Sequence, residues 1–164
     1  MSRVSVFTLS AALVTVAGAC NPRSSQLSNG PRMGVVTDTL GRTVTDTITG
    51  LVWQRDGSEL RAGCRGSGKL TCTWAEAKAY CASLALGGLS GWRLPAKMEL
   101  STIVDFTRTN PAVDPTVFPN TPSTLFWSST PVAGSSRYAW LVHFGGGGED
   151  VNLMENDYRV RCVR

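Results

Sequence analysis

Four cysteines set the main limit on how this chain can fold. Cys64, Cys72, Cys81 and Cys162 all follow an N-terminal stretch with the features of an export signal. The chain has a fifth cysteine, Cys20, directly after the signal; with Cys20 set aside, the remaining even number favours disulfides, because compartments outside the cytoplasm are oxidising. A zinc site is disfavoured, since no two of these cysteines are separated by two residues and the chain has a single histidine. We therefore expect two disulfides and no bound metal.

The export signal is predicted over residues 1–19. Arg3 gives it a basic start, and residues 4–16 form an apolar run too short to cross a bilayer. Small residues then precede Cys20, as in bacterial lipoproteins, so we expect Cys20 to carry the lipid that anchors the protein in a membrane. Ala17 stands where leucine is commonest in that motif, and ordinary signal peptidase would cut the same bond. A soluble exported protein is the alternative.

The remainder of the chain divides into a tether and one domain. Residues 20–34 are polar and contain Pro, Ser and Gly, which predicts a lipid-anchored flexible tether. Residues 35–164 have the length of one folded domain, and the 42% apolar content of the chain is enough for a core. We expect a bacterial outer-membrane lipoprotein, or else a periplasmic or extracellular protein.

The order of the cysteines favours one of the three possible pairings. Cys64 and Cys72 flank a short flexible loop, so we expect them to close it, which leaves Cys81 for Cys162. Cys81 falls on the apolar face of a predicted helix, and Cys162 shares a strand face with Val160. This second bridge would close a loop of about 80 residues and stabilise the fold by about 4 kcal/mol, against about 2–3 kcal/mol for the short loop.

Apolar periodicity predicts the first half of the domain. Residues 35–55 alternate β-branched and polar side chains, which indicates two or three short strands. Residues 73–86 predict a helix with a capping box, in which Thr73 caps the first turn and Glu76 reaches back. A second helix is expected from Pro95, at its first position, to Asp105.

The second half is predicted to be irregular and then β-rich. Four prolines exclude regular structure from residues 107–124. The segments LFWSS, YAWLVHF, EDVNLM and YRVRCVR then predict four strands, of which the last three form a meander. On the last strand, Arg159 and Arg161 would lie on the face opposite Val160 and Cys162. Strands, two helices and further strands indicate an α+β domain stapled by disulfides.

An ordered set of motifs resembles the Lcl C-terminal domain family, named after the tip domain of a collagen-like bacterial adhesin. The motifs are DTITGLVW (46–53), TWAEAKAYC (73–81), GGLSGWRLPAKMEL (87–100), FWSST (126–130) and VRCVR (160–164). The resemblance implies a C-type-lectin-like fold, related to formylglycine-generating enzymes, with short antiparallel sheets, two helices and long loops. It also implies surface recognition, with sulfated glycans as ligands of the namesake. This chain lacks the collagen-like stalk of that adhesin.

Several aromatic and motif residues are expected to be structural. They are Trp53, Trp74, Trp92, Arg93, Pro95, Trp127 and Trp140. We expect Trp92 to pack between the helices and the sheet and Arg93 to hydrogen-bond loop carbonyls, because a guanidinium beside a core must find partners. In the alternative interpretation, Trp92 stacks on a sugar and Arg93 binds an anion.

No catalytic arrangement is evident. His143 is the only histidine, and no serine or cysteine nucleophile lies in a known motif. An enzyme of the formylglycine-generating type would need reactive cysteines, whereas all four mature cysteines have structural partners. Glu149, Asp150, Glu155 and Asp157 could contribute to a calcium site, but a solvated hairpin is the simpler interpretation. We therefore expect a non-enzymatic protein without a cofactor.

Basic residues are the better functional signal. Without Arg3 the chain has 15 Lys and Arg against 12 acids, a net charge of about +3, which is too small to favour nucleic-acid binding. Arginine forks suit sulfate, carboxylate and phosphate groups. The candidate ligand-binding residues are Arg61, Arg65, Lys69, Arg137, Arg159 and Arg161.

The expected role is recognition or adhesion at the cell envelope, with an extracellular glycan or protein as the partner. Anionic, sulfated glycans are the leading ligand class. The alternative is a structural or assembly component of the envelope, and a homo-oligomer is compatible with either role.

Overall fold

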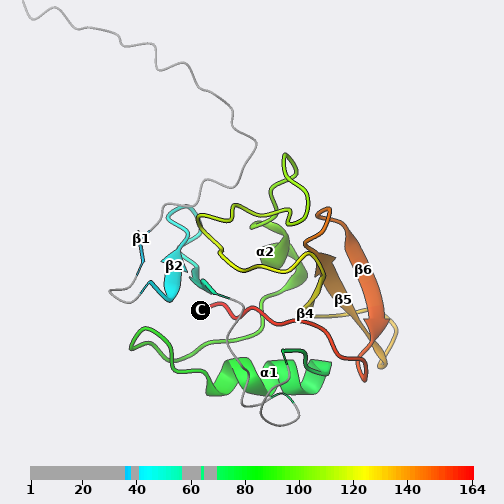
Figure 1. The fold of residues 1–164 in the computed structure, drawn as a ribbon. Coiled ribbons are helices and arrows are strands. Elements are labelled where there is room, and N and C mark those ends of the chain that lie inside the picture. Colours follow the sequence, from blue (N-terminus) through cyan, green and yellow to red (C-terminus); the bar gives the residue numbers. More distant parts are fainter. Residues whose placement is uncertain (1–35, 38–40, 57–63, 65–69) are drawn as a thin grey trace, which may run out of the picture.

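The computed structural model describes residues 36–37, 41–56, 64 and 70–164. The elements are β1 (Val36–Thr37), β2 (Thr43–Thr45), β3 (Val52–Gln54), α1 (Trp74–Ser83), α2 (Lys97–Ser101), β4 (Leu125–Pro131), β5 (Tyr138–His143) and β6 (Glu149–Leu153). They form two antiparallel sheets, β1-β2-β3 and β4-β5-β6. In Figure 1 the sheets lie on opposite sides of the domain, and α1 runs below them. The predicted α+β class is confirmed.

The C-terminal segment lies between the two sheets (Figure 1). Val52 and Arg164 exchange backbone hydrogen bonds on the β3 side, and the N–H of Trp127 donates to the carbonyl of Arg159 on the β4 side. The prediction of a strand over residues 158–164 is therefore wrong, as is its place in the meander, which consists of β4, β5 and β6. The segment changes partner every few residues and forms isolated bridges, so no single neighbour extends it into a ladder.

Helix α1 forms where it is predicted and ends at Ser83, before the predicted end at residue 86. The Thr73 hydroxyl accepts from the N–H of Glu76, and the Glu76 carboxylate accepts from the N–H of Thr73, which completes the capping box. Its buried face contains Ala77, Tyr80 and Cys81. Because Cys81 points inward, it meets the C-terminal segment there.

Both predicted disulfides are present. Cys81 is bonded to Cys162, with their Cα atoms 5.5 Å apart, and Cys64 is bonded to Cys72, with their Cα atoms 4.8 Å apart. All four cysteines are fully buried. The Cys81–Cys162 bridge joins α1 to the C-terminal segment, which is hydrogen-bonded to both sheets.

Helix α2 is shorter than predicted. It covers Lys97–Ser101, with Ala96 as its N-cap, so Pro95 precedes the helix and does not begin it. The Thr102 hydroxyl donates to the carbonyl of Glu99 at 2.6 Å, which competes with continuation of the helix. Ile103 and Val104, which fall within the predicted helix, are buried just beyond its observed end.

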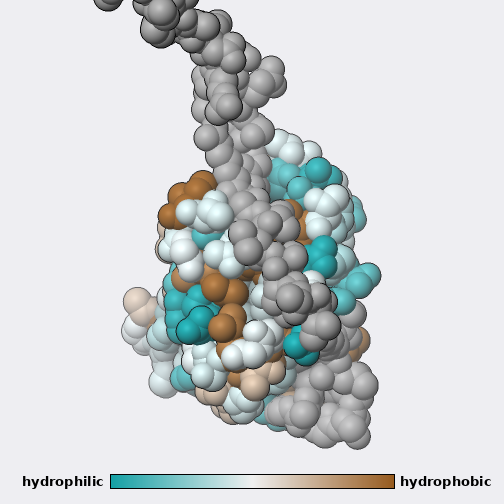
Figure 2. Space-filling model, turned by 90° about the vertical axis from the view of Figure 1, so that its left-hand side faces the viewer, coloured by the Kyte–Doolittle hydropathy of each residue, from teal (hydrophilic) through white to brown (hydrophobic). Residues whose placement is uncertain are grey.

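The core has two apolar clusters. One surrounds Phe118, Phe126 and Phe144, and the other surrounds Trp127 and the Cys81–Cys162 bridge. Residues 107–124 contain no helix or strand, as the prolines predict. Viewed from the side of β1 and β2, hydrophobic residues reach the surface only in small groups among hydrophilic ones (Figure 2). In the described part of the chain, no helix is long and apolar enough to span a membrane.

Candidate functional site

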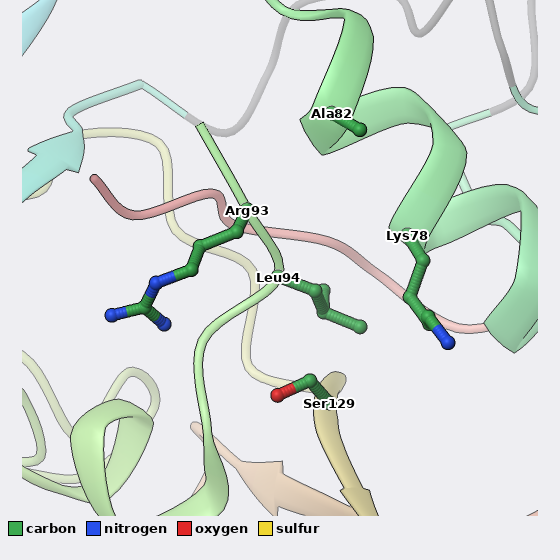
Figure 3. A pocket seen from close by; sticks show the side chains of 5 residues that line it. All are labelled: Lys78, Ala82, Arg93, Leu94 and Ser129. Carbon is green, nitrogen blue, oxygen red and sulfur yellow. The ribbon is translucent and has the colours of Figure 1, made fainter. Parts of the chain in front are cut away.

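A pocket lies between α1, the segment before α2, and β4. Its lining residues are Lys78, Ala82, Arg93, Leu94 and Ser129, and its volume is about 320 Å³. Figure 3 shows Lys78 and Arg93 pointing away from each other on either side of Leu94. The pocket, which we name the Lys78–Arg93 pocket, therefore has an apolar floor with a cation at each end.

A glycine turn and α2 together position Arg93. Gly87 and Gly88 adopt the left-handed region (φ 63° and 73°), and Leu86 and Leu89 on either side of them exchange backbone hydrogen bonds. Trp92 then donates from Nε1 to the carbonyl of Leu89 at 3.1 Å. These bonds fix the chain on the N-terminal side of Arg93.

The Arg93 side chain binds a carboxylate. Its two terminal nitrogens donate to the two carboxylate oxygens of Glu99 at 2.6 Å each, and the side chain remains 48% exposed. The bonds to Glu99 raise the pKa of Arg93, and the same bonds lower the pKa of Glu99. The prediction that the Arg93 guanidinium binds loop carbonyls is wrong, because Glu99 in the first turn of α2 supplies a charged partner. The main chain of Arg93, in contrast, exchanges backbone hydrogen bonds with Val163.

Lys78 lies against an indole. Its Nζ is 4.1 Å from the centre of a Trp74 ring, and Trp74 is held in turn by a 2.8 Å bond from Nε1 to the carbonyl of Ser128. Among the residues that the structure describes, Lys78 makes no ion pair. The ammonium is thus held in place by the indole without being neutralised.

A second ammonium–indole pair lies beyond β4. Lys97 places Nζ 4.3 Å from the centre of a Trp140 ring and 2.7 Å from a carboxylate oxygen of Glu149. The Ser128 hydroxyl donates to the backbone carbonyl of Trp140 at 2.8 Å, so Ser128 connects the Trp74 indole to the main chain of Trp140. Unlike Lys78, Lys97 already has a carboxylate partner.

A comparison with protein families identifies the domain. The sequence of residues 42–164 matches the family described as the Lcl C-terminal domain. The chain belongs to the Lcl C-terminal domain family. No curated protein matches it. The match covers β2, β3, the sheet β4-β5-β6, both helices and every residue of the Lys78–Arg93 pocket.

The tryptophans of this Lcl C-terminal domain divide into two groups. Trp53, Trp92 and Trp127 are buried, and Trp127 donates from Nε1 to the carbonyl of Cys72 at 2.9 Å. Trp92 is only 2% exposed, which fits the packing interpretation and leaves no face for a sugar. Trp74 and Trp140 are partly exposed, and their rings contact the ammonium groups of Lys78 and Lys97, respectively. Pro95 is buried, and its carbonyl accepts from the N–H of Ser129 at 2.7 Å.

Of the predicted basic residues, those that the structure describes, Arg137, Arg159 and Arg161, are not gathered at one site. Arg61, Arg65 and Lys69 lie outside the described residues. Arg137 is exposed, with a terminal nitrogen 3.9 Å from a carboxylate oxygen of Glu155. Arg159 lines a separate pocket.

Arg161 is not a surface residue, so its prediction as a ligand contact is wrong. It is fully buried, and it donates to the carbonyls of Gln54 and Arg55 and to the Thr121 hydroxyl. Strand alternation failed here because residues 160–163 are enclosed on every side by both sheets.

Sequence reasoning missed Lys78, Lys97 and Ser129. Trp74 and Lys78 are four residues apart on a predicted helix, a spacing that places side chains together, so this pair could have been found. Lys97 and Ser129 meet their partners only through the tertiary packing of α2 on β4 and β5.

The remaining titratable candidates are dispersed. His143 is exposed at the end of β5. Glu149 pairs with Lys97, Asp150 accepts from the N–H of Val151, and Glu155 faces Arg137. Within the described residues, no group of three His, Cys, Asp or Glu side chains could hold a metal ion.

Proposed function

We propose that this chain is a non-enzymatic recognition module of the bacterial cell envelope that binds an anionic, sulfated glycan at the Lys78–Arg93 pocket. The proposal includes export, a lipid on Cys20 and the C-type-lectin-like relationship that the family resemblance implies. Membership of the Lcl C-terminal domain family supports a recognition role, and the pocket supplies a location.

The observation that carries the proposal is the arrangement of two cations around an apolar floor. A sugar ring has an apolar C–H face, which can pack on the exposed Ala82 above the buried Leu94, while its sulfate groups reach outward to Lys78 and Arg93. Arg93 spends two of its five N–H donors on Glu99, which leaves three for a sulfate. Glu99 therefore orients the guanidinium and still leaves N–H donors for a ligand.

Catalysis has no part in the proposal. The four cysteines are joined in disulfides, and the single histidine is exposed at a strand end. The deepest charged groups, such as Arg161, serve the packing.

Heparin binding at low salt tests the proposal. Lys78→Ala should weaken binding about three- to tenfold, since one exposed charge contact is worth about 1 kcal/mol and is screened by salt. Arg137→Ala is the matched control, because it removes one exposed positive charge outside the pocket. Equal losses in both variants would show a general charge effect, and no binding by the unmodified protein would favour an assembly role in the envelope.

The anchor is tested separately. Intact-mass measurement of protein isolated from its native membrane should show a chain that begins at Cys20 and carries acyl groups. An unmodified thiol at Cys20 would remove the lipid anchor from the proposal and leave a soluble exported protein.

A further inference from the structure

A second pocket has a different chemistry. It lies between the residues that lead into β4 and the C-terminal segment, beside Cys72, and has a volume of about 400 Å³. Small-molecule sites in proteins have volumes of roughly 300–1,000 Å³, so this one is large enough for a small ligand. Its polar lining consists of Thr71, Ser123, Thr124, Asp157, Tyr158 and Arg159.

The wall of this pocket is held in place. Tyr158 and Cys72 exchange backbone hydrogen bonds of 2.9 and 2.8 Å, and the N–H of Arg159 donates to the carbonyl of Leu125. The Tyr158 ring packs edge-on against Trp127, with ring centres 5.1 Å apart, and its hydroxyl accepts from Asn152 at 2.6 Å. Because the backbone groups are already paired, a ligand would meet side chains on a rigid frame.

The charges in this pocket are of both signs. Asp157 and Arg159 are two residues apart on an extended chain, a spacing that places their side chains on the same side. A sulfate would be repelled by Asp157, and a cation would be repelled by Arg159. The pocket therefore disfavours the charged ligands that suit the Lys78–Arg93 pocket.

We propose that this second pocket binds a neutral saccharide unit. A carboxylate accepts hydrogen bonds from sugar hydroxyls, a guanidinium donates to sugar oxygens, and the hydroxyls of Thr71, Ser123 and Thr124 do both. Pro122 and Leu125 add apolar surface for the C–H face of a sugar ring. This site does not depend on what occupies the Lys78–Arg93 pocket.

Saturation-transfer NMR on the purified protein, with cellobiose, maltose and diacetylchitobiose as probes, tests the proposal. At least one disaccharide should bind with the same affinity at low and high salt, since the disaccharides are uncharged and the charges of Asp157 and Arg159 in the pocket offset each other. Ser123→Trp should abolish binding by filling the pocket, and the domain should stay folded because Ser123 is exposed. Asp157→Asn should weaken binding about tenfold or more, the loss expected for a hydrogen bond to a charged group.

Lys78→Ala is the control, and it should leave disaccharide binding unchanged. Three results would each overturn the proposal: no disaccharide binds, Ser123→Trp binds as well as the unmodified protein, or glycine binds where the sugars do not. Heparin binding that depends on Lys78 would survive any of these results, so the two proposals fail independently.

Discussion

The guanidinium of Arg161 lies 4.5 Å from the centre of the Phe118 ring, in the middle of the domain. Its donors reach the carbonyls of Gln54 and Arg55 at the end of β3, and the Thr121 hydroxyl in the irregular segment before β4. One side chain of the C-terminal segment thus connects the first sheet to the long loop. A buried arginine is tolerated here because both of its terminal nitrogens find carbonyl or hydroxyl acceptors.

We expect Arg161→Met to destabilise the domain by about 2–4 kcal/mol, because it leaves buried acceptors unpaired. Arg161→Lys should also destabilise it, since one ammonium cannot reach the acceptors that the fork joins. Urea unfolding of the purified variants measures both effects. Arg137→Met, at an exposed arginine, is the control and should change the free energy of unfolding by about 0.5 kcal/mol or less. A neutral Arg161→Met would contradict the structural role.

The two disulfides should differ in their contribution to stability. Replacing both Cys81 and Cys162 by Ala removes a bridge across 81 residues of sequence, whereas the Cys64–Cys72 pair spans 8. Loop-closure entropy predicts a loss of about 4 kcal/mol for the long bridge and about 2–3 kcal/mol for the short one. Thermal unfolding of the two double variants gives the comparison, and a larger loss for the short bridge would contradict the entropic account.

Local signals predicted much of this fold. The capping box at Thr73 and the inward position of Cys81 are encoded within a few residues of sequence. The C-terminal segment was mispredicted because its pattern of alternation is that of a strand, while its partners come from β3, Arg93 and β4 in turn. That arrangement depends on contacts across more than 100 residues, such as Arg161 with Gln54, which no local pattern contains.

The candidate site was predicted less well for a related reason. Counting basic residues picks out charge but not burial, so it included Arg161 and passed over Lys78. The pocket exists only because Arg93 and Ser129 are brought to α1 by the packing of β4. Arg93 was identified from its glycine-rich surroundings, yet its partner Glu99 became apparent only once α2 was placed.

Acid should destabilise the domain in part through Asp105. Burial alone would raise the pKa of Asp105, but hydrogen bonds from the hydroxyl and N–H of Thr107 and the ion pair with Arg108 outweigh burial and lower it. Because the folded-state pKa lies below the unfolded value of about 3.9, this stabilisation is present above that pH and is lost as the pH falls through the folded pKa.

Asp105→Asn should therefore flatten the dependence of unfolding free energy on pH in the acid range, and lower stability at neutral pH. Urea unfolding at a series of pH values measures both. Asp150→Asn removes the same charge at an exposed position and serves as the control. If the unfolding free energy of Asp105→Asn still fell as steeply with decreasing pH as that of the unmodified protein, the acid sensitivity would come from other carboxylates.

The turn between β5 and β6 offers a matched pair of glycines. Gly147 has a φ of +80°, and a Cβ there would lie 2.6 Å from a Val104 methyl and 3.0 Å from the Phe106 ring. Gly148 has nothing within 4 Å of the same position and does not adopt a positive φ. Gly147→Ala should cost about 2 kcal/mol or more, since the left-handed backbone alone costs an alanine about 1–2 kcal/mol and the contact with Val104 adds to it. Gly148→Ala should be neutral or stabilise the domain by about 0.4–1 kcal/mol by restricting the unfolded chain. Thermal unfolding of the two variants decides the point, and equal melting temperatures would mean that this turn does not pack against Val104 as the structure has it.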